Sequence, residues 1–231
     1  MKKTFAYVTF VLVTASLASV PANAQISVGA DLVSRYIWRG VDYGNSPGFQ
    51  PSLSYASGPF SIGSWGSYAF AGTNPPFSEQ DIWASYDLDI GRGSISVLLT
   101  DYYYPNAGLK FFDFDAIGGA HVLEAGFGYT GPPSIPFSFK AYYNFHNDPD
   151  NSVYLEGAYG FSVDEIEVTA FLGGTMAASA WYATDGAALI NVGMTASKSV
   201  VITESYSLPV FGTYLLNPEL EQSYLIVGFR F

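Results

Sequence analysis

The carboxy-terminal segment Ser223–Phe231 alternates strictly between two kinds of side chain. Successive residues of a β-strand point to opposite faces, so this pattern predicts a strand with one apolar face. Its last residue, Phe231, is aromatic and belongs to that apolar face. The apolar face carries Leu225, Val227, Phe229 and Phe231, and the other face carries Tyr224, Ile226, Gly228 and Arg230.

The amino terminus has the pattern of a bacterial export signal. Lys2 and Lys3 precede an apolar run, Phe5–Leu17, which is too short to cross a bilayer as a helix. The small residues of Ala22-Asn23-Ala24 then form a cleavage site, so residues 1–24 are predicted to be removed before Gln25. A retained anchor is the alternative, but no stop-transfer pattern follows.

Composition narrows the class of protein. The chain has 20 Asp and Glu against 9 Lys and Arg, a net charge of −11, which makes nucleic acid an unsuitable partner. It has no Cys, so neither disulfides nor a lipoprotein anchor are expected. Aromatic and glycine-rich sequence with only 13% charged residues, and without a long apolar run, favours membrane crossing by strands.

Alternating segments recur along the rest of the chain and predict about twelve strands, with ten as the alternative. Each is close to the length that a tilted strand needs to cross a bilayer. The predicted strands are Ile26–Gly40, Phe49–Ala56, Phe60–Ala71, Gln80–Ile90, Ser94–Tyr104, Ala120–Thr130, Phe137–His146, Ser152–Ser162, Ile166–Thr175, Ala188–Val201, Ser205–Leu216 and Gln222–Phe231.

The connections between these strands alternate between short and long, as in bacterial outer-membrane barrels. We therefore predict an all-β protein, in which residues 25–231 form one transmembrane antiparallel up-and-down β-barrel in the outer membrane. Its expected partners are outer-membrane lipids and the barrel-assembly machinery, which Phe229 and Phe231 would engage as an assembly signal. A soluble β-sandwich or barrel is the alternative, and the sequence leaves the oligomeric state open.

Aromatic residues gather near the strand ends on the predicted apolar face, as expected for two girdles at the membrane interfaces. One girdle would contain Tyr55, Phe60, Tyr129, Phe137, Phe161 and Phe231, and the outer one Tyr36, Trp38, Phe49, Tyr143 and Phe145.

The opposite, inward face carries the charges, because Lys or Arg on the lipid face would cost about 2–4 kcal/mol at the midplane. Arg35, Lys140 and Arg230 are placed to pair with acids of this face. One interpretation is a passive channel for small solutes or ions; the other is a structural or receptor-type barrel with a salt-bridged, closed lumen. The inward acids are Asp31, Asp81, Asp87, Asp89, Glu124, Glu156 and Glu167, and the inward bases are Arg35, Arg39, Lys140 and Arg230.

This surplus of acids predicts a weak preference for cations. A different outcome is expected if Arg35, Arg39 and Arg230 form a basic strip where the first and last strands meet, because such a strip would guide an anionic solute.

Catalysis has little support in the sequence. A lipid-modifying enzyme is the third candidate, because His121 lies near an outer strand end on the lipid-facing side and the loop residue Ser78 would have to approach it. There is no G-x-S-x-G motif. The acidic cluster at Asp148 and Asp150 lacks EF-hand spacing. We predict no enzyme, no cofactor and no metal.

Two blocks resemble a known family. Ser34, Tyr36, Arg39 and Gly40 match an S-x-Y-x-x-R-G block, and the W-G-S core at Trp65-Gly66-Ser67 is similar to the next block. The chain thereby resembles the TorF-type porin family, also called the Gcw_chp conserved hypothetical outer-membrane proteins. The resemblance implies an outer-membrane barrel described as a channel, without an established substrate or catalytic residues.

Overall fold

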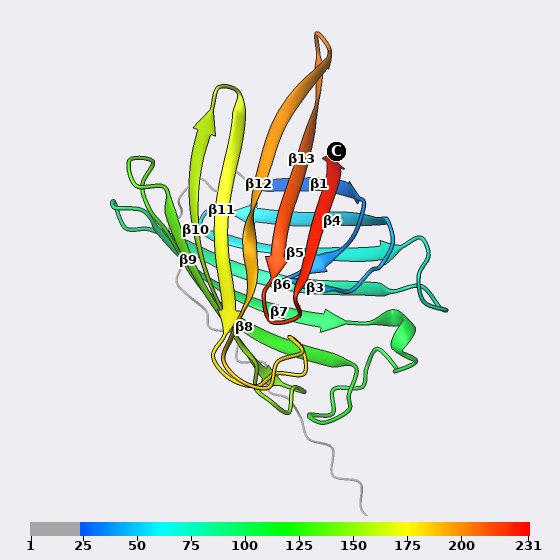
Figure 1. Ribbon diagram of the computed structural model, residues 1–231. Helices are drawn as coiled ribbons and strands as arrows, with labels where there is room; N and C mark the ends of the chain where they lie inside the picture. The colour runs from blue at the N-terminus through cyan, green and yellow to red at the C-terminus, as the bar shows by residue number, and fades with distance from the viewer. Residues whose placement is uncertain (1–23) are drawn as a thin grey trace, which may run out of the picture.

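Twelve antiparallel strands close into a barrel in the computed structural model, which describes residues 24–231 (Figure 1). Each strand pairs with its neighbours along the chain, and β14 returns to β1. The prediction of a twelve-stranded antiparallel barrel is confirmed, and the alternative of ten strands is wrong. The predicted export signal lies, apart from Ala24, outside the described residues. The strands are β1 (Gln25–Val33), β4 (Gly48–Ser57), β5 (Phe60–Ala69), β6 (Ser78–Asp89), β7 (Ser94–Tyr103), β8 (His121–Thr130), β9 (Phe137–His146), β10 (Val153–Val163), β11 (Ile166–Thr175), β12 (Ala188–Thr203), β13 (Tyr206–Asn217) and β14 (Gln222–Arg230).

The first predicted strand is the one whose extent was wrong. It was expected to reach Gly40, but β1 ends at Val33. The chain then leaves the barrel wall, and two short strands, β2 (Ile37–Trp38) and β3 (Val41–Asp42), form a separate hairpin. The other predicted boundaries agree with the structure to within two residues.

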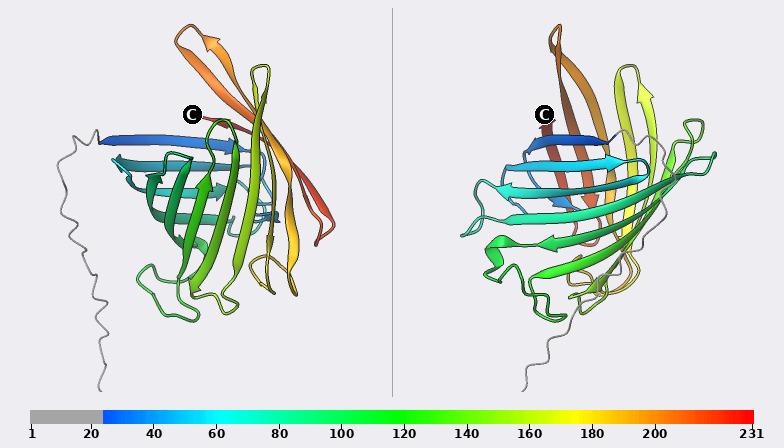
Figure 2. Two further views of the ribbon diagram at one scale, coloured as in Figure 1. Left: turned by 90° about the vertical axis from the view of Figure 1, so that its left-hand side faces the viewer. Right: turned by 180° about the vertical axis from the view of Figure 1, so that it is seen from behind.

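The two ends of the barrel differ in their connections. At one end, here called the turn end, the strands are joined by the short segments 58–59, 90–93, 131–136, 164–165 and 204–205. At the other, the loop end, the longer connections 34–47, 104–120 and 176–187 occur. The β12–β13 hairpin projects beyond its neighbours at the turn end (Figure 2), because β12 pairs with β13 out to Thr203 but with β11 only to Ser197.

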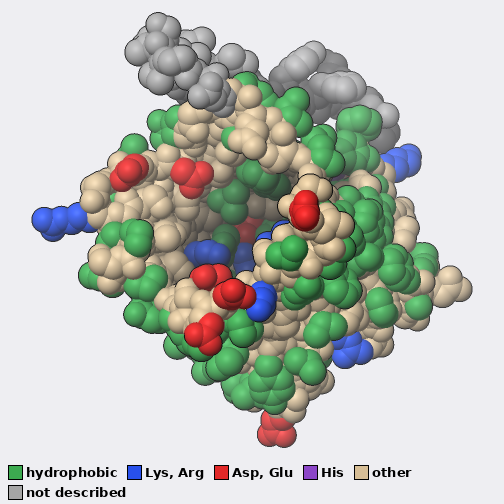
Figure 3. All heavy atoms as spheres, turned by 90° about the horizontal axis from the view of Figure 1, so that it is seen from above, with side chains coloured by type: hydrophobic (Ala, Val, Ile, Leu, Met, Phe, Trp, Pro, Cys, Tyr) green, Lys and Arg blue, Asp and Glu red, His purple; other side chains and the backbone are tan. Residues whose placement is uncertain are grey.

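The barrel is apolar outside and largely polar inside. Strand alternation places one row of side chains on each face, and every barrel strand contributes an exposed large apolar residue to the outside. Figure 3 shows the interior as a hollow that contains acidic and basic side chains and is bordered by hydrophobic ones. The outer row includes Val28, Leu53, Ile62, Ile82, Leu99, Phe127, Tyr143, Tyr159, Leu172, Met194, Tyr214 and Leu225.

Most of the predicted girdle residues lie on this outer face. Phe60, Phe137 and Phe161 near the turn end and Phe49 near the loop end are exposed there. Two predicted members of the outer girdle, Tyr36 and Trp38, are elsewhere, because the chain has already left the wall at Val33.

The barrel closes through a short seam. β1 and β14 share three paired positions, from Asp31↔Arg230 to Val33↔Gly228. Phe231 extends this seam, since its N–H donates to the Ala30 carbonyl at 2.9 Å. The helical content of the described residues is the single short 3-10 helix η1 (Pro105–Ala107), and no helix among them is long and apolar enough to cross a membrane.

Candidate functional site

The segment 34–47, which contains β2 and β3 and is here called the inner hairpin, crosses the inside of the barrel. Its residues contact inward-facing side chains of β8, β9 and β10 on one side, and the backbone of β12 and a side chain of β13 on the other. The segment is held together by the register pairs Ile37↔Asp42 and Trp38↔Val41 and by a turn at Arg39 and Gly40. The feature that fills the barrel is therefore a hairpin from the first long connection.

The tip of the inner hairpin requires glycine. Gly40 has φ +83°, in the left-handed region that favours glycine, and a Cβ there would overlap the carbonyl oxygen of Ile190. Ile190 is the extra residue of a β-bulge in β12, between Leu189 and Asn191, and is fully buried. The side-chain amide of Asn217 donates to the Gly40 carbonyl at 3.0 Å. The bulge and this hydrogen bond hold the tip against the far wall.

Arg39 forms the central polar contact of the lumen. Its Nη1 and Nη2 donate to the two carboxylate oxygens of Glu124, at 2.6 and 2.9 Å, in a bidentate ion pair. Both side chains are almost completely buried, with 8% and 2% of their surface exposed. The guanidinium carbon also lies 4.3, 4.1 and 4.7 Å from the ring centroids of Trp38, Tyr142 and Tyr154.

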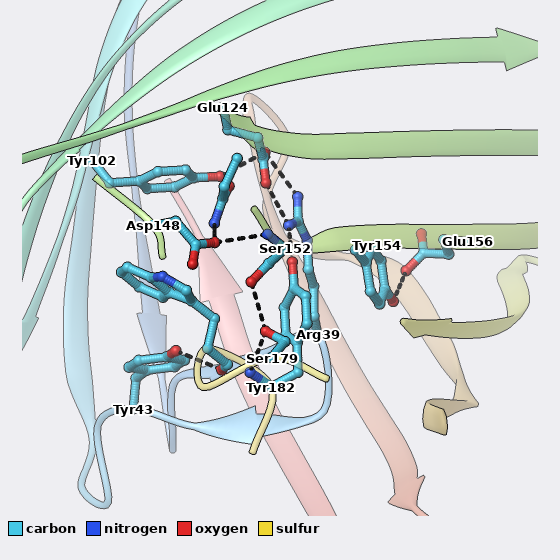
Figure 4. Close-up of polar contacts among 12 residues, drawn as sticks. Arg39, Tyr43, Tyr102, Glu124, Asp148, Ser152, Tyr154, Glu156, Ser179 and Tyr182 are labelled. Carbon is cyan, nitrogen blue, oxygen red and sulfur yellow. Dashed lines mark hydrogen bonds and ion pairs between the residues drawn. The ribbon is translucent and has the colours of Figure 1, made fainter. Parts of the chain in front are cut away.

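Two tyrosine hydroxyls complete this arrangement, as Figure 4 shows. The Tyr102 hydroxyl donates to Glu124 at 2.9 Å, and the Tyr182 hydroxyl accepts from Arg39 at 2.7 Å. Burial raises the pKa of the Tyr182 phenol to about 12, so it is neutral at physiological pH. Both terminal nitrogens of Arg39 and both carboxylate oxygens of Glu124 thus have hydrogen-bond partners, which stabilises a buried ion pair.

The loop 176–187 brings Tyr182 into the lumen and covers the inner hairpin. Tyr182 is completely buried, with its ring centroid 5.7 Å from that of Trp38. The loop is attached to the hairpin, where the Tyr43 hydroxyl donates to the Trp181 carbonyl at 3.1 Å, and to the barrel wall, where Ser179 Oγ lies 2.7 Å from Ser152 Oγ. The inner hairpin and this loop together occupy the loop-end part of the lumen.

A cavity of about 550 Å³ separates the inner hairpin from the wall formed by β5–β8. We call it the aromatic cavity, because three of the chain's four tryptophans line it. The Trp83 ring of β6 packs over Gly63 of the neighbouring strand β5. A Cβ on Gly63 would lie only 2.5 Å from Trp83 Cζ2, so a larger residue would leave no room for the ring. Its principal lining residues are Trp38, Trp65, Trp83, Tyr102, Asp81 and Glu124.

A second cavity, of about 690 Å³, lies nearer the turn end and has charged walls. It is lined by Glu165, Glu167, Lys198 and Arg230, among others. Lys198 forms an ion pair with Glu165 at 3.0 Å, and Arg230 forms one with Asp31 at 3.0 Å. The turn-end side of the lumen thus contains a cavity lined by charged residues, while the inner hairpin fills the loop end.

The predicted lumen residues occupy several separate places. Arg230 pairs with Asp31, and Lys140 lies 4.0 Å from Glu156, so both bases lie beside acids of the inward face, as the sequence suggested. Glu124 is bound by Arg39. Glu167 accepts from the Ser162 hydroxyl, and Asp87 accepts from the Ser85 hydroxyl. Phe229 and Phe231 are exposed on the outside.

The three arginines do not form the basic strip that the sequence analysis considered. Arg35 pairs with Asp42 of its own hairpin at 3.4 Å, while Arg39 and Arg230 bind acids on different strands. Each arginine is thus neutralised locally. The strip fails because Arg35 and Arg39 lie on the inner hairpin and not on a barrel strand that neighbours β14.

A polar cluster lies on the outer face at the loop end. His121 lies under the loop 104–120 and is completely buried. Its Nδ1 is 2.8 Å from Asp101 Oδ1, its Nε2 is 2.5 Å from the Phe111 carbonyl oxygen, and the Phe114 ring stacks on it. Both ring nitrogens are thus engaged by groups other than Ser78, and the arrangement fastens the loop to the barrel wall.

Two further expectations concern His146 and the acidic cluster. A register shift beside Glu124 pairs His146 with the outward residue Leu123, although alternation along β9 from Lys140 would place this histidine on the inward face. The Asp148 carboxylate accepts from the backbone N–H groups of Asp150 and Ser152, so it stabilises a turn. In the described part of the chain, no group of three or more His, Cys, Asp or Glu side chains is placed to hold a metal ion.

Glu79 and Tyr182 are lumen residues that were not predicted from the sequence. Glu79 was assigned to a loop, but β6 begins at Ser78, so Glu79 and Asp81 share the inward face by their spacing of two. That spacing was a usable signal. Tyr182 comes from a loop without periodicity, and no local pattern indicates where its side chain points.

Comparison with known families identifies the chain. Residues 18–202 match the model of a family described as bacterial proteins of unknown function (Gcw_chp). The match covers most of the chain, so the protein belongs to the Gcw_chp family. The search of curated proteins gave no match. The family description does not include porin activity.

Proposed function

We propose that this member of the Gcw_chp family is a bacterial outer-membrane barrel that serves as a passive channel for small solutes or ions, with the inner hairpin as its constriction. The observation that carries the proposal is a closed barrel with an exposed apolar exterior and, inside, cavities of about 550 and 690 Å³ lined partly by charged residues. Exposed apolar surface of this extent is unfavourable in water and favourable in lipid.

The inner hairpin is the natural constriction because it crosses the lumen and lines the aromatic cavity. A solute that passes through the barrel must pass beside Arg39, Glu124 and the surrounding aromatic rings. Polar and charged groups at such a narrowing select solutes by size and charge. The loop 176–187, which covers the hairpin, would then control access from the loop end.

A structural or receptor-type barrel with a closed lumen is the second candidate. The specific observation in its favour is the buried, bidentate Arg39–Glu124 pair, which fastens the inner hairpin to the wall. A hairpin attached in this way can act as a permanent closure. The two candidates differ in whether the barrel conducts.

Conductance is the first test. The refolded protein in a planar bilayer is expected to give stable conductance steps with a weak preference for cations, because acids outnumber bases among the inward residues. The preference should decrease as salt increases, since ions screen the lumen charges. The measurement is the reversal potential in a salt gradient, at low and at high ionic strength. An electrically closed bilayer with correctly folded protein would favour the structural candidate, and anion preference at low salt would refute the assignment of charge selectivity.

Assembly is the second test, and it concerns Phe231. Deletion of Phe231 is expected to reduce the amount of barrel inserted in the outer membrane, because it removes both the terminal aromatic and the hydrogen bond to Ala30 at the seam. The current per inserted molecule should stay unchanged. Phe231→Tyr, which keeps an aromatic ring and the backbone contact, is the matched control. Equal surface levels of the deletion variant and the wild type would contradict this role.

A further inference from the structure

The aromatic cavity contains a carboxylate without a partner. Asp81 is only 7% exposed, and its Oδ1 is buried without a hydrogen bond. Glu79, two residues earlier on the same face of β6, is 3% exposed. Among the described residues, neither carboxylate has Lys, Arg or His within ion-pair distance. Burying an uncompensated carboxylate is costly, and a positively charged ligand in the cavity would remove that cost.

The surroundings of Asp81 are aromatic. Cross-strand pairing places Trp65 of β5 and Tyr102 of β7 directly beside Asp81, and Trp83 follows on the same inward face of β6. Directly opposed residues in a sheet have their side chains in contact range. The faces of aromatic rings attract cations, and most strongly when the site is desolvated.

Arg39 provides an internal precedent for this arrangement. In the same cavity its guanidinium lies against the rings of Trp38 and Tyr142 while Glu124 neutralises its charge. A cation bound beside Asp81 would have the same two kinds of partner, a carboxylate and aromatic rings. Because Glu124 already neutralises Arg39, that arginine does not supply the charge that Asp81 lacks.

The size and the ligand atoms of the cavity distinguish between kinds of cation. A metal ion needs several oxygen or nitrogen ligands, and no suitable cluster occurs in the described part of the chain. A space of about 550 Å³ lies in the range of small-molecule sites. Asp81 Oδ1 has no hydrogen-bond donor, and a cationic ligand that carries N–H groups would supply both a donor and a positive charge.

We infer that the aromatic cavity binds a small organic cation of the alkylammonium or alkylguanidinium class, whose N–H donates to Asp81 while its alkyl part packs on Trp65 and Trp83. This inference rests on the proposed channel function and deepens it, because it names a class of solute that the lumen retains. The site is separate from the Arg39–Glu124 pair but shares its cavity.

The test uses n-butylammonium as the probe and tryptophan fluorescence of the refolded barrel as the readout, since three of the four tryptophans line the cavity. The wild type should show a saturable change with n-butylammonium and a weaker one with tetramethylammonium, which lacks N–H. Asp81→Asn should weaken n-butylammonium binding by about tenfold or more, as loss of a charged hydrogen bond implies.

Asp87→Asn is the matched control, because Asp87 is an inward acid of the same strand that lies outside the aromatic cavity. It should leave the affinity for n-butylammonium within about twofold of the wild type, well below the tenfold loss expected for Asp81→Asn.

Asp81→Asn should fold, since it removes an unpaired buried charge, and Glu79→Gln gives a second variant that is expected to weaken binding. Equal affinity in the wild type and in Asp81→Asn, or no saturable change in the wild type, would overturn the inference.

Potassium conductance recorded on the same preparation separates this inference from the proposed function. Conductance without saturable n-butylammonium binding would overturn the cation site and leave the channel intact. Binding that depends on Asp81 in a barrel that does not conduct would support the site and refute the channel.

Discussion

Alanine in place of Arg39 is expected to increase the single-channel conductance of the reconstituted barrel. The substitution removes the bidentate pair with Glu124, the bond to Tyr182 and the contacts with Trp38, Tyr142 and Tyr154. Loss of one partner from a buried pair costs about 3–5 kcal/mol, because the other charge stays buried. The free energy that favours the docked over the undocked inner hairpin should therefore decrease by most of its value. The constriction should then widen. Single-channel recording in a planar bilayer measures the effect.

Arg35→Ala is the matched control for this prediction. Arg35 belongs to the same inner hairpin, but its partner, Asp42, lies on the hairpin itself, and the arginine is 37% exposed. A pair this exposed contributes about 0–1 kcal/mol. Its loss should leave the conductance close to that of the wild type. Equal currents in Arg39→Ala, Arg35→Ala and the wild type would contradict the role of Arg39 in holding the constriction.

The second large effect is expected at Gly40. Alanine at this position must adopt φ near +83° and also displace the Ile190 carbonyl, since its Cβ would overlap that oxygen. The left-handed backbone alone costs about 1–2 kcal/mol for a residue with a Cβ, and the overlap adds to it. We expect the hairpin tip to leave the β12 wall, with a lower melting temperature and easier proteolysis of residues 34–47.

Gly58→Ala separates the two costs. Gly58 also has positive φ, +58°, but a Cβ there meets no atom within 4 Å. This variant carries the backbone cost without the overlap, and it lies far from the inner hairpin, in the β4–β5 turn. Its proteolysis pattern should match that of the wild type. If Gly40→Ala is no less stable than Gly58→Ala, the close approach of the hairpin tip to β12 does not matter for the fold.

The barrel wall is readable from the sequence because each strand depends on local alternation. Residues such as Leu172 and Met194 alternate with smaller or polar ones over about ten residues, and a closed barrel gives every such strand the same two environments. The register shifts at Gly173 and Val201 are not visible in this way, since a bulge interrupts the alternation by one residue.

Alternation does not predict the inner hairpin, because apolar and polar residues continue to alternate through Tyr36 and Trp38 after the chain has left the barrel wall. What redirects the chain is tertiary: the buried Arg39–Glu124 pair and the fit of Gly40 against Ile190. Residues 39 and 124 are far apart in the sequence, and several inward bases were equally suitable partners for Glu124. The sequence pattern indicates that Arg39 and Glu124 both face inward, but it does not indicate that they pair with each other.

The most direct test of the proposed function is chemical modification of the inner hairpin during current recording. The chain has no Cys, so a cysteine introduced at Val41 in β3 is the only thiol present. Leu99→Cys, on the exposed apolar face of β7, is the control. If the hairpin lines the pathway, a charged methanethiosulfonate reagent will change the current through a Val41→Cys barrel within the same recording and leave a Leu99→Cys barrel unaffected. A Val41→Cys barrel that conducts and whose current stays constant after complete modification, verified by mass, would contradict the hairpin as the constriction.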